Sequence, residues 1–200
     1  AGEHRVAVEA RGRYSNSGQG LHRFHDPVDG ATYLYTHFEP SDSRRAWASM
    51  DQPDLKSPFS LTVVHPAGWT VLGNGVVEES RPSRELPEAV MTRFATTLPL
   101  PSYLTALAAG PWHRVSSQWR SPLRPDSEPV DLSWSCRASL ARHLDADELL
   151  EVTAAGMTLY DEAYGYPYPW GAYDSVLVPE YNLGAMENPG CVTFNEEAYL

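Results

Sequence analysis

Short runs of alternating hydrophobic and polar residues, separated by glycine and proline, fill the first half of the chain. Alternation with a period of two is typical of strands that bury one face. No long stripe of apolar residues at helical spacing occurs in this half. The pattern therefore predicts an antiparallel all-β region, with a tight turn at Asn74-Gly75. Its strands are expected at residues 3–10, 31–39, 61–64, 70–77, 90–97 and 103–108.

The strand expected at residues 31–39 places two sets of side chains on opposite faces. One face carries Tyr33, Tyr35, His37 and Glu39. The other face carries Leu34, Thr36 and Phe38. The alternation alone favours a solvated polar face opposite a buried apolar face. In either case His37 and Glu39 are expected to point the same way.

The pattern changes after a Pro- and Ser-rich junction at residues 110–129. We place a domain boundary there, giving a partial β domain at residues 1–117 and the start of a second domain at residues 118–200. A strand is expected at 130–136, a helix at 146–164 and a further strand at 173–178. Asp145 and Glu148 resemble a capping box at the start of the helix, and Gly165 is expected to end it. The apolar stripe of the helix is expected at Leu149, Val152, Ala155, Leu159 and Ala163.

The composition and charge of the chain argue against some classes of function. The 200 residues carry a formal net charge of −11, with 42% hydrophobic residues and a mean hydropathy of −0.40. These values are typical of a globular protein, and the acidity argues against a nucleic-acid partner. No apolar run is long enough to span a membrane. Two cysteines, Cys136 and Cys191, are too few for a disulfide framework and are expected to be small buried residues of a cytoplasmic protein.

The segment Gly184-Ala185-Met186-Glu187-Asn188 lies between two strand-like runs near the end of the chain. Glycine and small residues let another backbone approach closely, and an exposed strand edge can pair with an extended peptide. Glu187 is the single carboxylate in this run, placed to meet a positive group. The alternative left open by the residues alone is a surface turn with an ordinary exposed glutamate.

Several stretches resemble one family. Residues 184–188 match the GAMEN motif of the M1 zinc aminopeptidases. Residues 35–40, Tyr-Thr-His-Phe-Glu-Pro, resemble that family's Y-T-Q-F-E-P stretch. Residues 51–56 are similar to its D-[EQ]-P-x-[LF]-K stretch. Residues 18–24 and 136–140 resemble the aminopeptidase N branch of actinobacteria.

The resemblance implies an α+β chain: part of a saddle-like antiparallel N-terminal β domain, followed by the beginning of a thermolysin-like α/β catalytic domain. It also implies an aminopeptidase of the alanyl type, which releases N-terminal residues from peptides with a free N-terminus. Glu39 and Glu187 would hold the substrate's α-amine. Further substrate-binding residues would be His37, where the family usually has Gln, and Leu183, Gly184, Ala185, Met186 and Asn188. This segment would hold no catalytic residue.

The family's cofactor is Zn²⁺, held through an H-E-x-x-H motif. None of the seven histidines forms that motif. His22 and His25 are expected at the surface or in support of neighbouring residues. The zinc ligands are therefore expected beyond Leu200, and these 200 residues alone are expected to be inactive.

Two other interpretations are open. The protein can be a catalytically silent M1-like scaffold or peptide-binding module, which the downstream sequence would decide. It can also be an epoxide hydrolase-type relative, although that branch carries GGMEN and this chain has Ala185. For His37, carboxylates nearby are expected to raise the pKa above its ordinary value of about 6.5.

Overall fold

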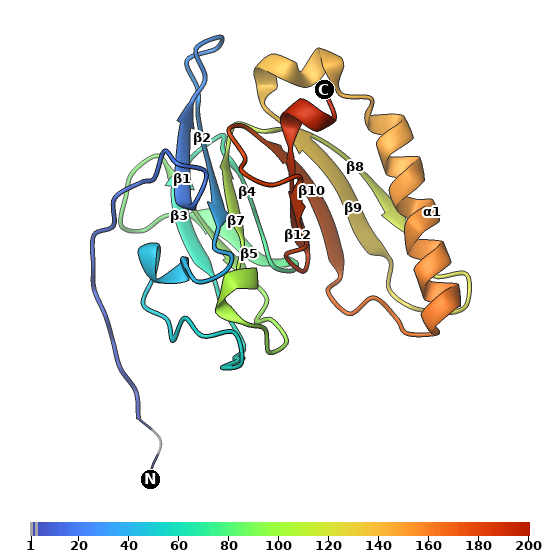
Figure 1. Cartoon of the computed structure of the whole chain (residues 1–200), viewed down its shortest axis with the longest axis horizontal. Helices are drawn as coiled ribbons and strands as arrows, with labels where there is room; N and C mark the ends of the chain where they lie inside the picture. Colours follow the sequence, from blue (N-terminus) through green and yellow to red (C-terminus); the bar gives the residue numbers. More distant parts are fainter. Residues whose placement is uncertain (1, 3) are drawn as a thin grey trace.

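The computed structural model describes residues 2 and 4–200, which form strands β1–β12 and one α-helix (Figure 1). The first strands are β1 (Gly20–His25), β2 (Thr32–His37), β3 (Thr62–Pro66), β4 (Thr70–Gly73), β5 (Val77–Pro82), β6 (Ala89–Phe94) and β7 (Leu107–Gly110). The later elements are β8 (His113–Trp119), β9 (Val130–Cys136), α1 (Ala146–Tyr164), β10 (Ala172–Val178), β11 (Ala185–Met186) and β12 (Cys191–Asn195). Short 3₁₀ helices lie at Ser43–Arg45, Ser102–Leu104, Ala138–His143 and Glu196–Ala198.

The first seven strands form two antiparallel sheets. One has the order β1-β2-β7-β4 and the other the order β3-β6-β5. The strands β1 and β2 make a hairpin whose register places Leu21 opposite Thr36 and His22 opposite Tyr35. The antiparallel all-β character predicted from the alternation is therefore confirmed.

The remaining strands form a mixed sheet in the order β11-β12-β10-β9-β8. Strands β9 and β12 both run parallel to β10, and α1 connects β9 to β10. Parallel neighbours need a crossover connection of this kind, which is why a helix appears here and not earlier in the chain. The edge strands β8 and β11 are antiparallel to their neighbours. The expected α+β fold, a β region followed by the start of an α/β region, is confirmed.

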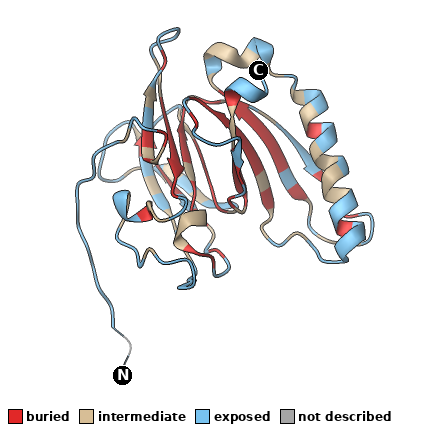
Figure 2. Ribbon diagram, in the orientation of Figure 1, coloured by how far each residue is buried: buried red, intermediate tan, exposed pale blue. Residues whose placement is uncertain are grey.

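The sheets and the helix stack as four layers. The three-stranded sheet packs on one face of the four-stranded sheet, the mixed sheet covers the other face, and α1 packs on the far side of the mixed sheet. Figure 1 shows α1 beside β8 and β9, on the opposite side of the molecule from β1. Buried residues concentrate on the strands in the middle of this stack (Figure 2). The largest buried cluster joins the four-stranded and mixed sheets through Tyr33, Tyr35, Leu72, Ala106, Ala108, Trp112, Val176, Val178, Tyr181, Met186 and Cys191.

This arrangement corrects the expectation of a solvated face on β2. Tyr33 and Tyr35 are 0% exposed because the mixed sheet covers their side of the strand. Leu34, on the opposite side, belongs to a second cluster with Val71, Phe94 and Ala109. Both faces of β2 are therefore buried, because it is an inner strand between two other layers.

Helix α1 begins and ends where its capping residues predict. The side chain of Asp145 accepts a hydrogen bond from the backbone N–H of Glu148. Gly165 adopts the left-handed conformation, with a φ of 63°, and its N–H bonds to the carbonyl of Asp161 at 2.9 Å. Glycine adopts this conformation without steric cost, so it ends the helix cleanly.

The buried face of α1 differs from the predicted stripe. Val152 and Leu159 are 64% and 62% exposed, whereas Leu150 and Asp161 are buried. Asp161 accepts hydrogen bonds from Ser121 and Arg124. The helix thus turns a partly polar side toward the sheet, which a search for apolar residues alone does not find.

Two tryptophans of the sheet explain why polar residues suit this face. The indole Nε1 of Trp119 donates to Thr158 at 2.9 Å, and that of Trp134 donates to Thr153 at 3.0 Å. A buried indole N–H needs an acceptor, and the threonine hydroxyls supply it. The helix is therefore oriented by hydrogen bonds as well as by apolar contact.

Other expected strands shift or fail. Residues 4–10 form no regular structure, and residue 3 lies outside the described residues. Val6 and Val8 are 81% and 62% exposed, and none of the described strands pairs with this segment. The expected strand 70–77 ends at Gly73, and 103–108 gives only the start of β7 after a 3₁₀ turn. Strands β1, β5 and β8 were not predicted.

The turn at Asn74-Gly75 joins two sheets rather than closing a hairpin, since β4 and β5 belong to different sheets. The Asn74 side chain accepts from the N–H of Ala106 and donates to the carbonyls of Leu104 and Pro189. Residue 117 lies within β8, which pairs with β9 along its length. The division into domains at residues 117 and 118 stays a prediction.

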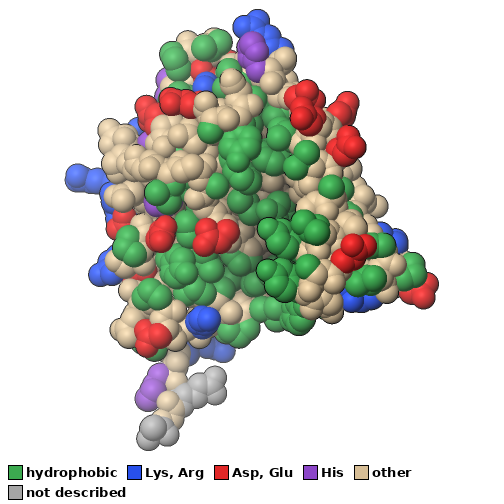
Figure 3. Space-filling view, turned by 45° about the vertical axis from the view of Figure 1, so that its right-hand side comes forward, with side chains coloured by type: hydrophobic (Ala, Val, Ile, Leu, Met, Phe, Trp, Pro, Cys, Tyr) green, Lys and Arg blue, Asp and Glu red, His purple; other side chains and the backbone are tan. Residues whose placement is uncertain are grey.

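An apolar groove lies between α1 and the mixed sheet, lined by Tyr173 and Phe194 of the sheet and by Tyr168 of the connection before β10. It encloses a cavity of about 800 Å³, and Tyr160, Tyr164 and Tyr199 also line it. Figure 3, which brings the helix side forward, shows hydrophobic side chains gathered there. The described helix is not long and apolar enough to cross a membrane. Both cysteines are free and buried, as predicted.

Candidate functional site

The segment Gly184–Asn188 forms the free edge of the mixed sheet. Its residues Ala185 and Met186 make up β11, which pairs with Phe194 and Thr193 of β12 and has no strand on its other side among the described residues. Met186 and Asn188 are each 2% exposed, while Glu187 between them is exposed. The alternation of a strand explains this pattern, because successive side chains point to opposite faces. The segment is thus anchored inward and presents the Glu187 carboxylate outward.

Backbone hydrogen bonds hold both ends of this segment. The carbonyl of Gly184 accepts from the N–H of Asn195 at 2.9 Å, and the carbonyl of Asn188 accepts from the N–H of Cys191 at 3.0 Å. Gly184 and Ala185 are exposed. The backbone of this edge is therefore ordered and accessible, as pairing with an extended peptide requires.

The connection from β10 to β11 is fastened to the first hairpin. The Glu180 carbonyl accepts a hydrogen bond from Tyr35 Oη at 3.3 Å, and Asn182 Nδ2 donates to the carbonyl of Ser17 at 2.6 Å. Gly18, with a φ of +73°, has no room for a side chain, since a Cβ there would lie 2.6 Å from Asn182 Nδ2. The N-terminal sheet and the segment 184–188 are therefore held in a fixed relation.

His22 contacts the same connection between β10 and β11. It is 0% exposed, and its Nδ1 accepts from the N–H of Gly18 at 2.9 Å. Its Nε2 lies 3.1 Å from Oε2 of Glu180, although not along an aligned hydrogen bond. Burial lowers the pKa of His22, and Glu180 opposes this shift only in part. His25 is exposed, and both histidines lie on β1 rather than in a loop.

His37 and Glu39 lie at the end of β2. His37 is the last residue of the strand and is 4% exposed, whereas Glu39 lies beyond the strand and is exposed. Burial lowers the pKa of His37 below its ordinary value, and the charges of Glu39 and Asp42 oppose this only in part. The expectation of a raised pKa is wrong, because it considered the nearby carboxylates but not the layer that buries the ring.

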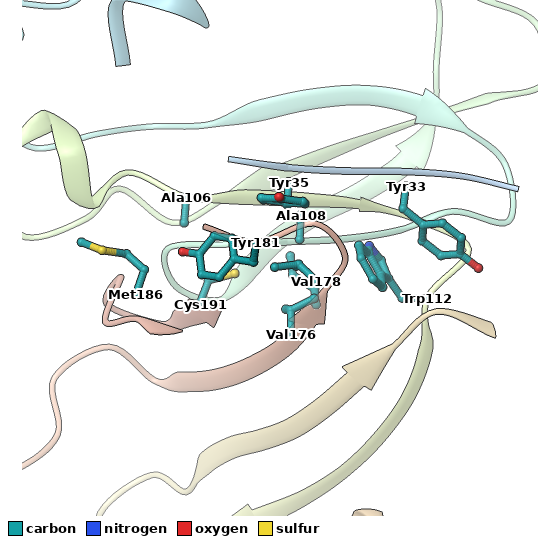
Figure 4. Packing of buried hydrophobic residues seen from close by; sticks show 11 residues of the cluster. Tyr33, Tyr35, Ala106, Ala108, Trp112, Val176, Val178, Tyr181, Met186 and Cys191 are labelled. Carbon is teal, nitrogen blue, oxygen red and sulfur yellow. The ribbon is translucent and has the colours of Figure 1, made fainter. Parts of the chain in front are cut away.

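Tyr181 contacts both His37 at the end of β2 and Thr193 on β12, and no sequence pattern predicted this role. Its hydroxyl lies 3.1 Å from His37 Nδ1 and 2.8 Å from Thr193 Oγ1. Figure 4 shows its ring in the same row of buried side chains as Met186 and Cys191. No motif marks a tyrosine at this position. Only contacts between residues 144 positions apart reveal its role.

Glu39 and Glu187 both act on this tyrosine. Burial raises the pKa of Tyr181 above its ordinary value, and both carboxylates add to that effect. Glu39 follows β2 and Glu187 follows β11, so two exposed carboxylates from different parts of the fold act on one buried hydroxyl. Such a pair can receive a cation through charge-assisted hydrogen bonds.

Leu183 lies next to the segment 184–188 and is 37% exposed. A half-exposed leucine beside an accessible edge can contact an apolar group that lies along that edge. Among residues 2 and 4–200, no three His, Cys, Asp or Glu side chains are grouped so that they could hold a metal ion. The described residues therefore do not fit a zinc site by themselves.

Comparisons with known proteins agree with this picture. Residues 1–104 match the model of the peptidase M1 N-terminal domain, and residues 148–200 match that of the peptidase family M1 domain. The chain is 45% identical to aminopeptidase N of Streptomyces lividans over 196 residues, covering 98% of this chain and 22% of the relative. It is 31% identical to human aminopeptidase N and 29% identical to the mouse protein, each covering 82% of this chain and 16% of the relative. The chain thus spans between about a sixth and about a fifth of the length of these relatives.

Proposed function

Because the chain belongs to the M1 family of peptidases, we propose that its protein is an aminopeptidase that releases N-terminal residues from peptides. In this proposal the 200 residues recognise the substrate's free α-amine and the first part of its backbone. The observation that carries the proposal is the pair of exposed carboxylates, Glu39 and Glu187, whose charges both act on the buried Tyr181.

The chemistry of the amine fits this pair. A peptide α-amine has a pKa of about 8, so it is mostly a cation at neutral pH. Glu39 and Glu187 would each accept a hydrogen bond from the ammonium, and hydrogen bonds between charged groups are stronger than neutral ones. An amine held at a fixed point on the enzyme leaves only the first peptide bond in reach of the reacting groups.

The edge strand β11 would hold the substrate backbone. Gly184 and Ala185 are exposed, and β11 has a free side among the described residues. A substrate in extended form can therefore add to the sheet there. Leu183 would contact the first side chain, while buried Met186 and Asn188 keep the strand in place.

Zinc is part of the proposal as the cofactor of the whole enzyme, with ligands outside these 200 residues. When bound, such an ion activates a water molecule and polarises the carbonyl that is attacked. The residues of this chain bind and orient the substrate, and we assign none of them to the chemical step. A cytoplasmic location is proposed on the two free cysteines. Neither a nucleic acid nor a membrane is proposed as a partner.

One comparison of substrates tests the proposal. The full-length protein should hydrolyse a leucine or alanine anilide, and it should not hydrolyse the same anilide after N-acetylation, which removes the cation. Equal hydrolysis of both substrates would contradict amine recognition. Binding of a free-amine peptide without turnover would favour the alternative of a silent peptide-binding module.

A further inference from the structure

We propose, on the premise of the function above, that Tyr181 is a positioning residue that fixes the tautomer of His37. It holds the ring with its hydrogen on Nε2, so that the ring nitrogen not bonded to Tyr181 is an N–H donor and not a lone pair. His37 thereby offers no second acceptor to the substrate ammonium, which is left to the two glutamates.

The contacts form a chain of three polar groups in a dry environment. Thr193 Oγ1, Tyr181 Oη and His37 Nδ1 follow one another at 2.8 and 3.1 Å. The three residues are 1%, 6% and 4% exposed. Because water is excluded, each hydrogen in the chain must be shared among these groups, and its direction decides the tautomer.

Hydrogen-bond chemistry selects one direction. A phenol is a stronger acid than an aliphatic hydroxyl, and an imidazole nitrogen is a better acceptor than a hydroxyl oxygen. The favoured order is therefore Thr193 donating to Tyr181, and Tyr181 donating to Nδ1 of His37. A neutral imidazole that accepts at Nδ1 carries its hydrogen at Nε2.

The surrounding charges favour the same result. Glu39 and Asp42, both on the segment that continues β2, are the charged groups that act on His37. Tyr181, from the connection before β11, is the titratable group that faces it across the layers. Two negative charges stabilise a ring N–H over a ring lone pair. The neutral state itself follows from burial, which lowers the pKa of His37.

The chain of contacts also reaches the edge strand. Thr193 lies opposite Met186 in the pairing of β11 with β12. Tyr181 therefore joins β12, the partner of β11, to the end of β2 through one hydroxyl. A change at this hydroxyl is expected to disturb how the two carboxylates are presented, without exposing the core.

Nitrogen-15 NMR of selectively histidine-labelled full-length protein tests the tautomer directly. The His37 signals are identified by their loss in H37Q. We expect the hydrogen on Nε2 in the parent, and a loss of that preference in Y181F. The matched control is Y35F, since Tyr35 is another buried tyrosine in the same cluster whose hydroxyl bonds to the Glu180 carbonyl and not to His37. A hydrogen on Nδ1 in the parent, or an unchanged preference in Y181F, would overturn the assignment.

A double-mutant cycle tests the effect on the reaction. Y181F should lower kcat/KM about three- to tenfold in the parent and much less in the H37Q background, since coupled neighbours are not additive. An equal loss in both backgrounds would contradict a positioning role and would leave Tyr181 a packing residue. If the protein proves inactive on every peptide, the proposed function fails, while the NMR result still decides the tautomer.

Discussion

The guanidinium of Arg137 donates two hydrogen bonds to the carboxylate of Glu196, from Nε at 2.9 Å and from Nη2 at 2.7 Å. Its Nη1 donates to Asp26, which is 0% exposed. Asp26 follows β1 and Glu196 follows β12, so one cation joins the N-terminal hairpin to the last turn. The relation between the four-stranded and mixed sheets therefore rests on polar as well as apolar contacts.

Replacing this cation should destabilise the chain strongly. R137M leaves two buried carboxylates without a partner, which typically costs about 3–5 kcal/mol. Urea denaturation measures the loss in the free energy of unfolding. The control is R93M, because Arg93 pairs with Glu78 and Glu79 at a half-exposed site where a pair contributes about 1 kcal/mol or less. Similar losses in both variants would show that Arg137 is not a buried clamp.

The two glutamates are the direct test of amine recognition. E39Q and E187Q in the full-length protein should each lower kcat/KM by an amount equivalent to about 2–4 kcal/mol of activation free energy, because one partner of a desolvated charge pair is lost. Zinc content should stay the same. E162Q, on the exposed side of α1, serves as the control and should change little. Near-normal activity of either E39Q or E187Q would remove that residue from the site.

The buried histidine gives a pH dependence with a defined sign. The pKa of His37 in the folded state lies below 6.5, so the unfolded chain binds more protons as the pH falls through that value. Stability is therefore full above pH 6.5 and is lost as the pH falls toward the folded pKa, by up to about 1.4 kcal/mol per pH unit. H37Q should reduce this slope and leave stability above pH 7 nearly pH-independent.

The same measurement separates His37 from other groups. His22 has a lowered pKa too, so H37Q should remove only part of the slope. Asp26 and Asp51 also have lowered pKa values, but their contribution is lost only below their ordinary pKa of 3.8. Unfolding free energies at intervals between pH 4.5 and 7.5 give the comparison. A parent curve that stays flat down to pH 5 would contradict the burial of both rings.

The face of α1 can be tested with two leucines. L150A should cost about 2–4 kcal/mol, since Leu150 is 8% exposed and its removal leaves a cavity. L159A should cost less than about 0.5 kcal/mol, since Leu159 is 62% exposed. Both variants change the same helix by the same number of atoms. A larger loss of stability in L159A than in L150A would show that the helix buries the apolar stripe predicted from the sequence.

The metal can be tested on the 200-residue chain itself. We expect it to bind no stoichiometric zinc and to hydrolyse no aminoacyl anilide, since its described residues hold no set of metal ligands. Metal analysis after dialysis, together with an anilide assay, gives the answer. Stoichiometric zinc with turnover would show that the site lies within this chain.

Local signals were enough to predict part of the fold. Alternation placed most strands to within a few residues, and the cap residues Asp145 and Gly165 set the bounds of α1. The face of the helix was not predictable from apolar spacing, because Thr153, Thr158 and Asp161 are bound by residues far away in the sequence. Residues 4–10 alternate like a strand, but no strand in the described part of the chain pairs with them.

The candidate site also has features that the sequence predicts and features that it does not. The exposed position of Glu187 at a strand edge follows from its neighbours in the sequence, and the structure places it there. The burial of His37 does not follow, because it depends on packing against residues far away in the sequence, such as Tyr181, which is 144 positions away. No local sequence pattern marks Tyr181, because its role comes from its contacts with Thr193 and with His37, which belongs to the neighbouring sheet.

The shortness of β11 has a consequence for the range of peptides that the proposed site accepts. A strand of two residues, Ala185–Met186, offers main-chain partners to the head of an extended peptide only. This edge would therefore hold a tripeptide and a decapeptide with the same first residues about equally, and affinity should be insensitive to chain length. The same brevity gives a second copy of the protein little to pair with, so an open edge is tolerated without the risk of self-association that a long one brings.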